Sequence, residues 1–247
     1  MKTVRSLILA AALTLSVSSL SLATPSGQIW IPSTDAKGFK EVNISIDNYV
    51  RTSTKDDAYA NSFDAGVTVG VSPFEKFKFE AGFDYFVYEN TDASSKNPLN
   101  LNAKAAVPED AFFKGMPALA VGIFGVNTSE DALSADIKYG LLAKTFPVVG
   151  RLSVGGYTGD KEVLVDESGE KDNTGFMLSW DRAMPEISDK LWVAVDYMSG
   201  DNAFGALSVG AAWSFSKNVS LLVGANFYNK TETGGKPTIT TQLDINF

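Results

Sequence analysis

The stretch Ile239-Thr240-Thr241-Gln242-Leu243-Asp244-Ile245-Asn246-Phe247 decides the fold. Most of its odd positions carry apolar side chains, and every even position between them is polar. Because successive side chains of a β-strand point to opposite faces, this alternation predicts a strand with one apolar and one polar face.

The same alternation recurs from about Phe39 onward, in segments separated by turn-forming residues. In the segment from Phe77 to Val87, large apolar residues such as Phe79 and Phe83 alternate with polar residues such as Glu80. The weakest segment runs from Pro117 to Val126, since both of its faces are apolar. With that segment included, the pattern predicts about twelve strands, an even number as a single-chain membrane barrel requires.

A terminal alternating strand that stops on an aromatic residue resembles the last strand of Gram-negative outer-membrane β-barrel proteins. The resemblance implies an all-β fold, a transmembrane antiparallel up-and-down β-barrel over residues 39–247, surrounded by outer-membrane lipid. It also implies that Phe247 is an assembly signal for the barrel assembly machinery. A soluble β-sandwich is the alternative fold, with the same alternation but its apolar face turned inward. The even strand number and the alternation of short turns with longer polar loops favour the barrel.

The first residues predict export. Lys2 and Arg5 precede an apolar run, and Ser21 and Ala23 occupy the positions expected of a cleavage site before Thr24. Residues 1–23 are therefore a predicted signal peptide, and residues 24–38 a predicted periplasmic N-terminal segment. Two placements of this segment stay open: it tucks into the barrel, or it anchors Trp30 at the periplasmic interface.

Composition excludes several functions. The chain has no cysteine and no histidine, which removes disulfides, thiolate metal sites and the usual base of hydrolytic enzymes. Without Lys2 and Arg5, 19 cationic residues would stand against 29 acidic ones, a balance that argues against nucleic acid as a partner. We expect no enzymatic activity, cofactor or metal site. The acidic loop 159–173 is better explained as a solvated loop than as a cation site, since its spacing departs from the EF-hand pattern.

The alternate positions that carry polar residues in each strand predict which charged residues line the lumen. Twelve strands would enclose a backbone radius of roughly 12 Å. The predicted lining has nine acidic and six basic residues: Glu41, Asp47, Asp64, Glu80, Asp84, Asp136, Asp181, Asp196 and Asp244, against Arg51, Lys78, Lys104, Lys138, Lys144 and Arg151. These residues either form a selectivity lining or pair with one another across the lumen.

The sequence therefore predicts a porin-like channel of the bacterial cell outer membrane, through which small hydrophilic solutes diffuse with a mild preference for cations. One alternative is a structural or adhesive barrel with a closed lumen and binding outer loops. Another is a transporter of a small, more apolar solute, suggested by inward aromatic residues: Phe86, Tyr88, Phe124, Trp192 and Tyr228.

Overall fold

The structure is a computed structural model that describes residues 26–55, 59–89, 97–127, 129 and 134–247. The predicted signal peptide, residues 1–23, lies outside the described residues. Over the described part of the chain, no helix is long and apolar enough to cross a membrane.

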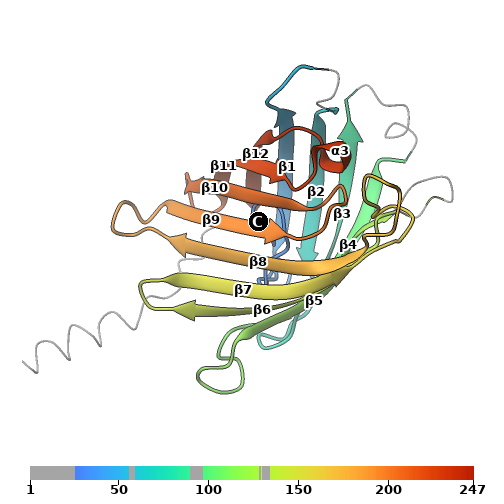
Figure 1. Ribbon diagram of the computed structural model, residues 1–247. Helices are drawn as coiled ribbons and strands as arrows, with labels where there is room; N and C mark the ends of the chain where they lie inside the picture. Colours follow the sequence, from blue (N-terminus) through green and yellow to red (C-terminus); the bar gives the residue numbers. More distant parts are fainter. Residues whose placement is uncertain (1–25, 56–58, 90–96, 128, 130–133) are drawn as a thin grey trace, which may run out of the picture.

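Twelve antiparallel strands form a closed barrel in which each strand pairs with its neighbours in the chain (Figure 1). The predicted fold class is confirmed, and the weakly predicted fifth strand is present. The strands are β1 (Val42–Arg51), β2 (Ser62–Gly70), β3 (Lys78–Tyr88), β4 (Leu99–Val107), β5 (Ala118–Asn127), β6 (Ile137–Phe146), β7 (Gly150–Thr158), β8 (Thr174–Ala183), β9 (Leu191–Met198), β10 (Ala206–Ser214), β11 (Val219–Tyr228) and β12 (Thr238–Asn246).

Pairing between β1 and β12 closes the sheet. The register runs from Asn43 opposite Asn246 to Arg51 opposite Thr238. Beyond the last strand residue, the Phe247 N–H donates to the Val42 carbonyl oxygen at 2.8 Å, and the Val42 N–H donates to the Phe247 oxygen at 3.1 Å. Both edges of the sheet are thereby paired, which is the condition for a sheet in lipid.

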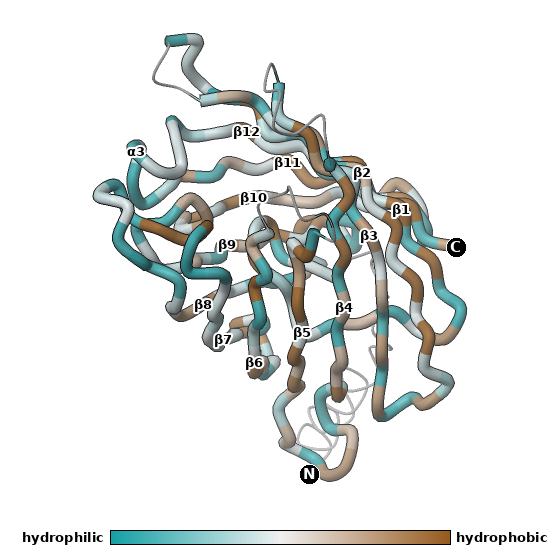
Figure 2. The backbone as a smooth tube through the Cα atoms, turned by 90° about the vertical axis from the view of Figure 1, so that its right-hand side faces the viewer, coloured by the Kyte–Doolittle hydropathy of each residue, from teal (hydrophilic) through white to brown (hydrophobic). Residues whose placement is uncertain are grey.

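Apolar residues cover the outside of the barrel. Val121, Val154 and Phe176 are exposed, whereas inward polar residues such as Thr240 and Asn226 are fully buried. Figure 2 shows this alternation as brown and teal segments along the strands. An apolar outer face with a polar inner face is the pattern of a transmembrane barrel and the reverse of a soluble sandwich.

The predicted parity is wrong in β6. Ile137, Tyr139 and Leu141 point inward and are almost completely buried, whereas Lys138 lies exposed on the outer face. The register agrees with this orientation, because the inward Lys104 lies opposite Gly122, which in turn lies opposite Tyr139. The physical reason is that this side of the lumen is an apolar core rather than a water-filled space, so its large apolar residues face inward.

The two ends of the barrel differ, as predicted. Short connections such as 147–149 and 215–218 lie at the end where β1 begins and β12 ends, which we call the short-turn end. Longer connections such as 159–173 lie at the other end, the long-loop end, where the short helix α3 (Thr231–Gly234) also lies (Figure 1).

Substitutions at two neighbouring positions of β2 test which side chains of the barrel wall face lipid and which face the lumen. Val67 lies opposite the outward Phe83, and Thr68 borders an internal cavity. We expect Val67→Arg to cost about 2–4 kcal/mol, because it places a charge on the lipid face, and Thr68→Arg to cost clearly less. Denaturant titration of refolding into lipid vesicles measures both. Equal costs at the two positions would contradict the register.

Candidate functional site

The lumen contains a hairpin made by the N-terminal segment. Residues Ser26–Ser33, which we call the lumen hairpin, fold back on themselves: the Ser33 N–H donates to the Ser26 oxygen at 3.1 Å, and the Gln28 N–H donates to the Ile31 oxygen at 2.7 Å. Figure 1 shows this segment, in blue, within the ring of strands. Of the two placements that the sequence left open, the structure shows residues 26–33 inside the barrel.

Polar side chains of the barrel satisfy the backbone of the hairpin tip. The Asp196 carboxylate accepts the N–H groups of Ile29 at 2.7 Å and Trp30 at 3.0 Å. The Gln242 amide donates to the Ile29 carbonyl oxygen at 2.7 Å. Since buried N–H and C=O groups without partners are costly, these contacts allow an irregular segment to lie inside the barrel.

The two residues at the tip, Ile29 and Trp30, each pack closely against side chains or glycines of the barrel wall. A Cβ atom at Gly210 or Gly224, which are directly paired on β10 and β11, would lie 3.2–3.3 Å from the Ile29 side chain, so these glycines make room for it. The Trp30 ring makes edge contacts with Tyr49 and Tyr228, at centroid distances of 5.4 and 5.8 Å. Its indole N–H donates to the Phe204 oxygen at 2.8 Å.

Ile31 extends an apolar core along β6 to β9. It packs in one cluster with Ile137, Leu141, Met177 and Met198. Leu164, from the long loop 159–173, is fully buried in the same cluster. This half of the lumen is therefore filled by protein, and burial of each such side chain contributes about 1.5–3 kcal/mol.

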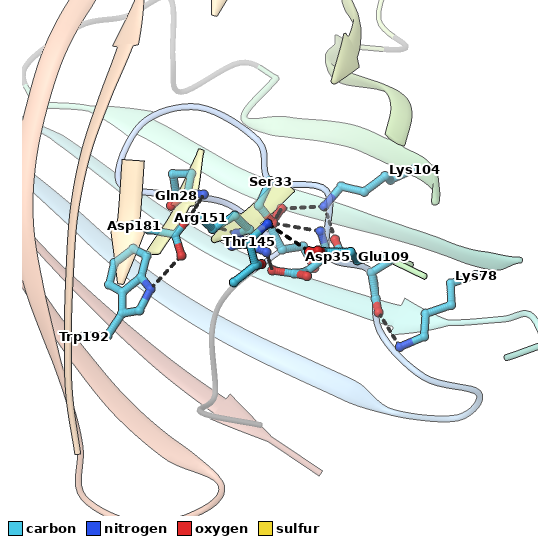
Figure 3. A network of polar contacts seen from close by, with 12 residues as sticks. Gln28, Ser33, Asp35, Lys78, Lys104, Glu109, Thr145, Arg151, Asp181 and Trp192 are labelled. Carbon is cyan, nitrogen blue, oxygen red and sulfur yellow. Dashed lines mark hydrogen bonds and ion pairs between the residues drawn. The ribbon is translucent and has the colours of Figure 1, made fainter. Parts of the chain in front are cut away.

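Charged side chains hold the base of the segment near the short-turn end (Figure 3). Glu80 accepts from the Ser26 hydroxyl at 2.9 Å and forms a buried ion pair with Lys104 at 3.1 Å. Lys104 also donates to the carbonyl oxygens of Ser26 and Asp35. The Asp35 carboxylate pairs with Arg151 at 2.6 Å. Segments that are far apart in the sequence are thus joined through the hairpin.

Three further contacts complete this base. Arg151 pairs with Asp181 at 2.9 Å, and the Gln28 amide donates to the same carboxylate at 2.9 Å. The Lys37 ammonium donates to Asn246 at 2.8 Å. Burial lowers the pKa of Lys37 below its ordinary range, and the carboxylates of Asp244 and Glu41 act in the opposite direction.

Space remains in the lumen on the side of β1 to β4. A cavity of about 230 Å³ lies between these strands and the hairpin. Its wall carries five acidic residues: Glu80, Asp244 and a group of three, Asp47, Asp64 and Asp84. Asp47 and Asp64 are direct cross-strand partners, and Asp84 lies opposite Gly66, two residues along β2 from Asp64. Among the described residues, none of the three forms an ion pair.

The predicted lining residues therefore divide into three groups. Asp136, Lys138 and Lys144 are not in the lumen: Lys138 lies on the outer face, Lys144 pairs with Glu109 and Asp110 at a turn, and Asp136 accepts a hydrogen bond from Ser134 at the rim. Most of the others contact the hairpin, its continuation or a loop: Glu41, Arg51, Lys78, Glu80, Lys104, Arg151, Asp181 and Asp196. Asp47, Asp64 and Asp84 border the cavity, as does Asp244, which accepts a hydrogen bond from Asn43.

Sequence reasoning left open whether this segment enters the lumen, and it did not identify the side chains that the segment contacts there. The signal that points to this segment is the apolar run Ile29-Trp30-Ile31 between polar residues, too short for a strand of its own. The neighbouring Leu141 and Leu142 likewise show that the parity of β6 is ambiguous.

The acidic loop 159–173 folds onto itself and onto the barrel. The Asp166 carboxylate accepts the N–H groups of Ser168 and Glu170, and Val165 forms a bridge with Lys171. In the part of the chain that the structure describes, no three carboxylates converge closely enough to hold a metal ion.

Comparison with known proteins gives structural similarity only. No protein family and no curated protein matches the sequence. The fold is similar to an outer membrane channel from Pseudomonas putida F1, with 11% identity, a TM-score of 0.49, and coverage of 91% of this chain and 100% of that one. It is also similar to OmpF of Salmonella typhi, solved with daunomycin, at 10% identity, a TM-score of 0.44, and coverage of 84% and 97%.

A third similar structure is a mutant of the Rhodopseudomonas blastica porin, at 16% identity and a TM-score of 0.41. The match covers 74% of this chain and 55% of that porin, so the chain spans little more than half of its length. The closed barrel with its apolar outer face defines the class: this protein has the fold of an outer-membrane β-barrel.

The Asp196 contacts predict how firmly the hairpin is held. Asp196→Ala leaves two buried N–H groups without an acceptor, so we expect docking of the hairpin to weaken by about 1–3 kcal/mol. Hydrogen exchange of residues 26–33, followed by mass spectrometry, should accelerate accordingly. Asp201→Ala, at an exposed carboxylate of the 199–205 loop, serves as the control and should leave exchange unchanged. Unaltered protection in Asp196→Ala would show that the anchor lies elsewhere.

Proposed function

We propose that the protein is an outer-membrane channel for small hydrophilic solutes, with a preference for cations. The observation that carries this proposal is the acidic side of the lumen, where Asp47, Asp64 and Asp84 border open space and no described cation pairs with them. Rings of carboxylates that face a water-filled path favour cations.

The distribution of charge supports the direction of the preference. Lys104 borders the same cavity but is paired with Glu80, and Arg151 is paired with Asp35 and Asp181 beneath the hairpin. Arg51 donates to two carbonyl oxygens of the loop that holds α3 and lies over the Tyr228 ring. Paired carboxylates therefore offset the charges of Lys104 and Arg151. Among the described residues, Asp47, Asp64 and Asp84 have no paired cation.

The lumen hairpin narrows the path. Together with the inward apolar residues of β6 to β9 it fills that side of the lumen, and its tip packs against β10 to β12. The cavity remains beside β1 to β4. A conducting path through this barrel would thus be lined by β1 to β4 on one side and by the hairpin on the other. We expect a small conductance compared with that of a wide general porin.

The same hairpin favours one second function, a barrel whose lumen is closed and whose long loops bind a partner. Inward apolar packing of Ile31, Leu164 and Met198 is what a permanently closed barrel requires. The two functions differ in one measurable property, the passage of ions.

Planar bilayer recordings of the refolded protein test the proposal. We expect a steady small current whose reversal potential in a dilute KCl gradient shows cation preference, weaker at ~1 M salt because salt screens the carboxylates. The triple variant Asp47→Asn, Asp64→Asn and Asp84→Asn should lose most of that preference while retaining current.

Glu167→Gln together with Glu170→Gln is the matched control, because it removes exposed acidic charge in the outer loop 159–173 rather than in the lumen. Its selectivity should equal that of the unaltered protein. Anion preference would refute the proposal, and a complete lack of current would favour the closed barrel.

A further inference from the structure

We infer that the cavity beside the lumen hairpin is a binding site for a short linear organic dication, such as an aliphatic diamine. This inference deepens the proposed function, on which it rests for the route by which the ligand reaches the site. It concerns the arrangement of the cavity wall rather than its overall charge.

The carboxylates are spaced along a line. Asp47 and Asp64 are direct partners on β1 and β2, and directly opposed residues have Cβ atoms about 4.5–5.5 Å apart. Asp84 is the diagonal neighbour of Asp64 on β3, and such neighbours lie about 7–8 Å apart. The acidic groups thus run across three strands, and an extended molecule with an amine at each end matches this row better than a compact ion does.

Some residues that border this space carry acceptor atoms without hydrogen-bond partners among the described residues. Asp47 Oδ1 and Asp64 Oδ1 are buried and have no hydrogen-bond partner among the described residues. Gln28 also borders the cavity, is 2% exposed, and its Oε1 has no partner in the described part of the chain either. Buried acceptors without donors are costly, and ammonium groups, which carry three donors each, would satisfy them.

The remaining wall suits the carbon chain of such a ligand. Trp30, Tyr49 and Tyr139 border the cavity, and aromatic rings attract ammonium groups as well as methylene groups. At about 230 Å³ the cavity far exceeds the roughly 10–15 Å³ that one water needs. Lys104, which also borders it, is paired with Glu80 and so does not oppose a cation there.

Isothermal titration of the protein refolded in detergent, at low salt, tests the site with 1,4-diaminobutane as the probe. We expect saturable binding, at least tenfold tighter than that of 1-aminobutane, because the monoamine can satisfy one end of the row only. Asp64→Asn, at the centre of the row, should weaken diamine binding at least tenfold. The substitution keeps the shape of the side chain and removes repulsion between like charges, so the barrel should fold.

Asp201→Asn, at an exposed loop carboxylate, is the control and should bind as the unaltered protein does. Absence of saturable binding, equal affinity for the two amines, or unchanged affinity in Asp64→Asn would each overturn the inference. Because binding in detergent requires no ion flow, the two proposals fail separately. Binding without current removes the channel and keeps the site, whereas cation current without diamine binding removes the site alone.

Discussion

Closure of the sheet by β1 and β12 is the constraint from which the rest of the structure follows. A membrane provides no partner for a free strand edge, so the first and last strands must pair along their length, from Asn43 with Asn246 to Arg51 with Thr238. Closure also fixes the parity of every other strand, because paired residues share a face. It thereby creates an interior that must be filled by water or by protein.

Protein fills one part of the interior, and space remains in the other part. On the side of β6 to β9, Ile31 and the inward apolar residues form a core, and Asp196 and Gln242 satisfy the backbone of the intruding hairpin. Buried ion pairs such as Lys104–Glu80 are weak evidence for stability but strong determinants of position, since separating the partners would leave a buried charge. The hairpin is therefore held in one register against the wall.

The sequence predicted the strands of the barrel wall well and the contents of the lumen poorly. Alternation and turn residues were sufficient for twelve strands, since Phe79, Glu80 and their neighbours repeat with period two. The same pattern could not reveal that Lys138 faces outward, because its parity was judged on the assumption of a polar lumen. Once Ile31 occupies that lumen, an inward Ile137 is favourable. Contacts such as Gln28 with Asp181 join residues too distant in the chain for any local pattern to predict them. The role of Phe247 in assembly stays a prediction.

This division of the lumen also explains where charge remains available. Lys104 is matched by Glu80, and Arg151 by Asp35 and Asp181. Asp47, Asp64 and Asp84 take no part in these pairs and lie next to the space that the hairpin leaves open. A segment that fills one half of a barrel thus concentrates the net charge of the lumen in the other half. Selectivity would then depend as much on where the hairpin lies as on the carboxylates themselves.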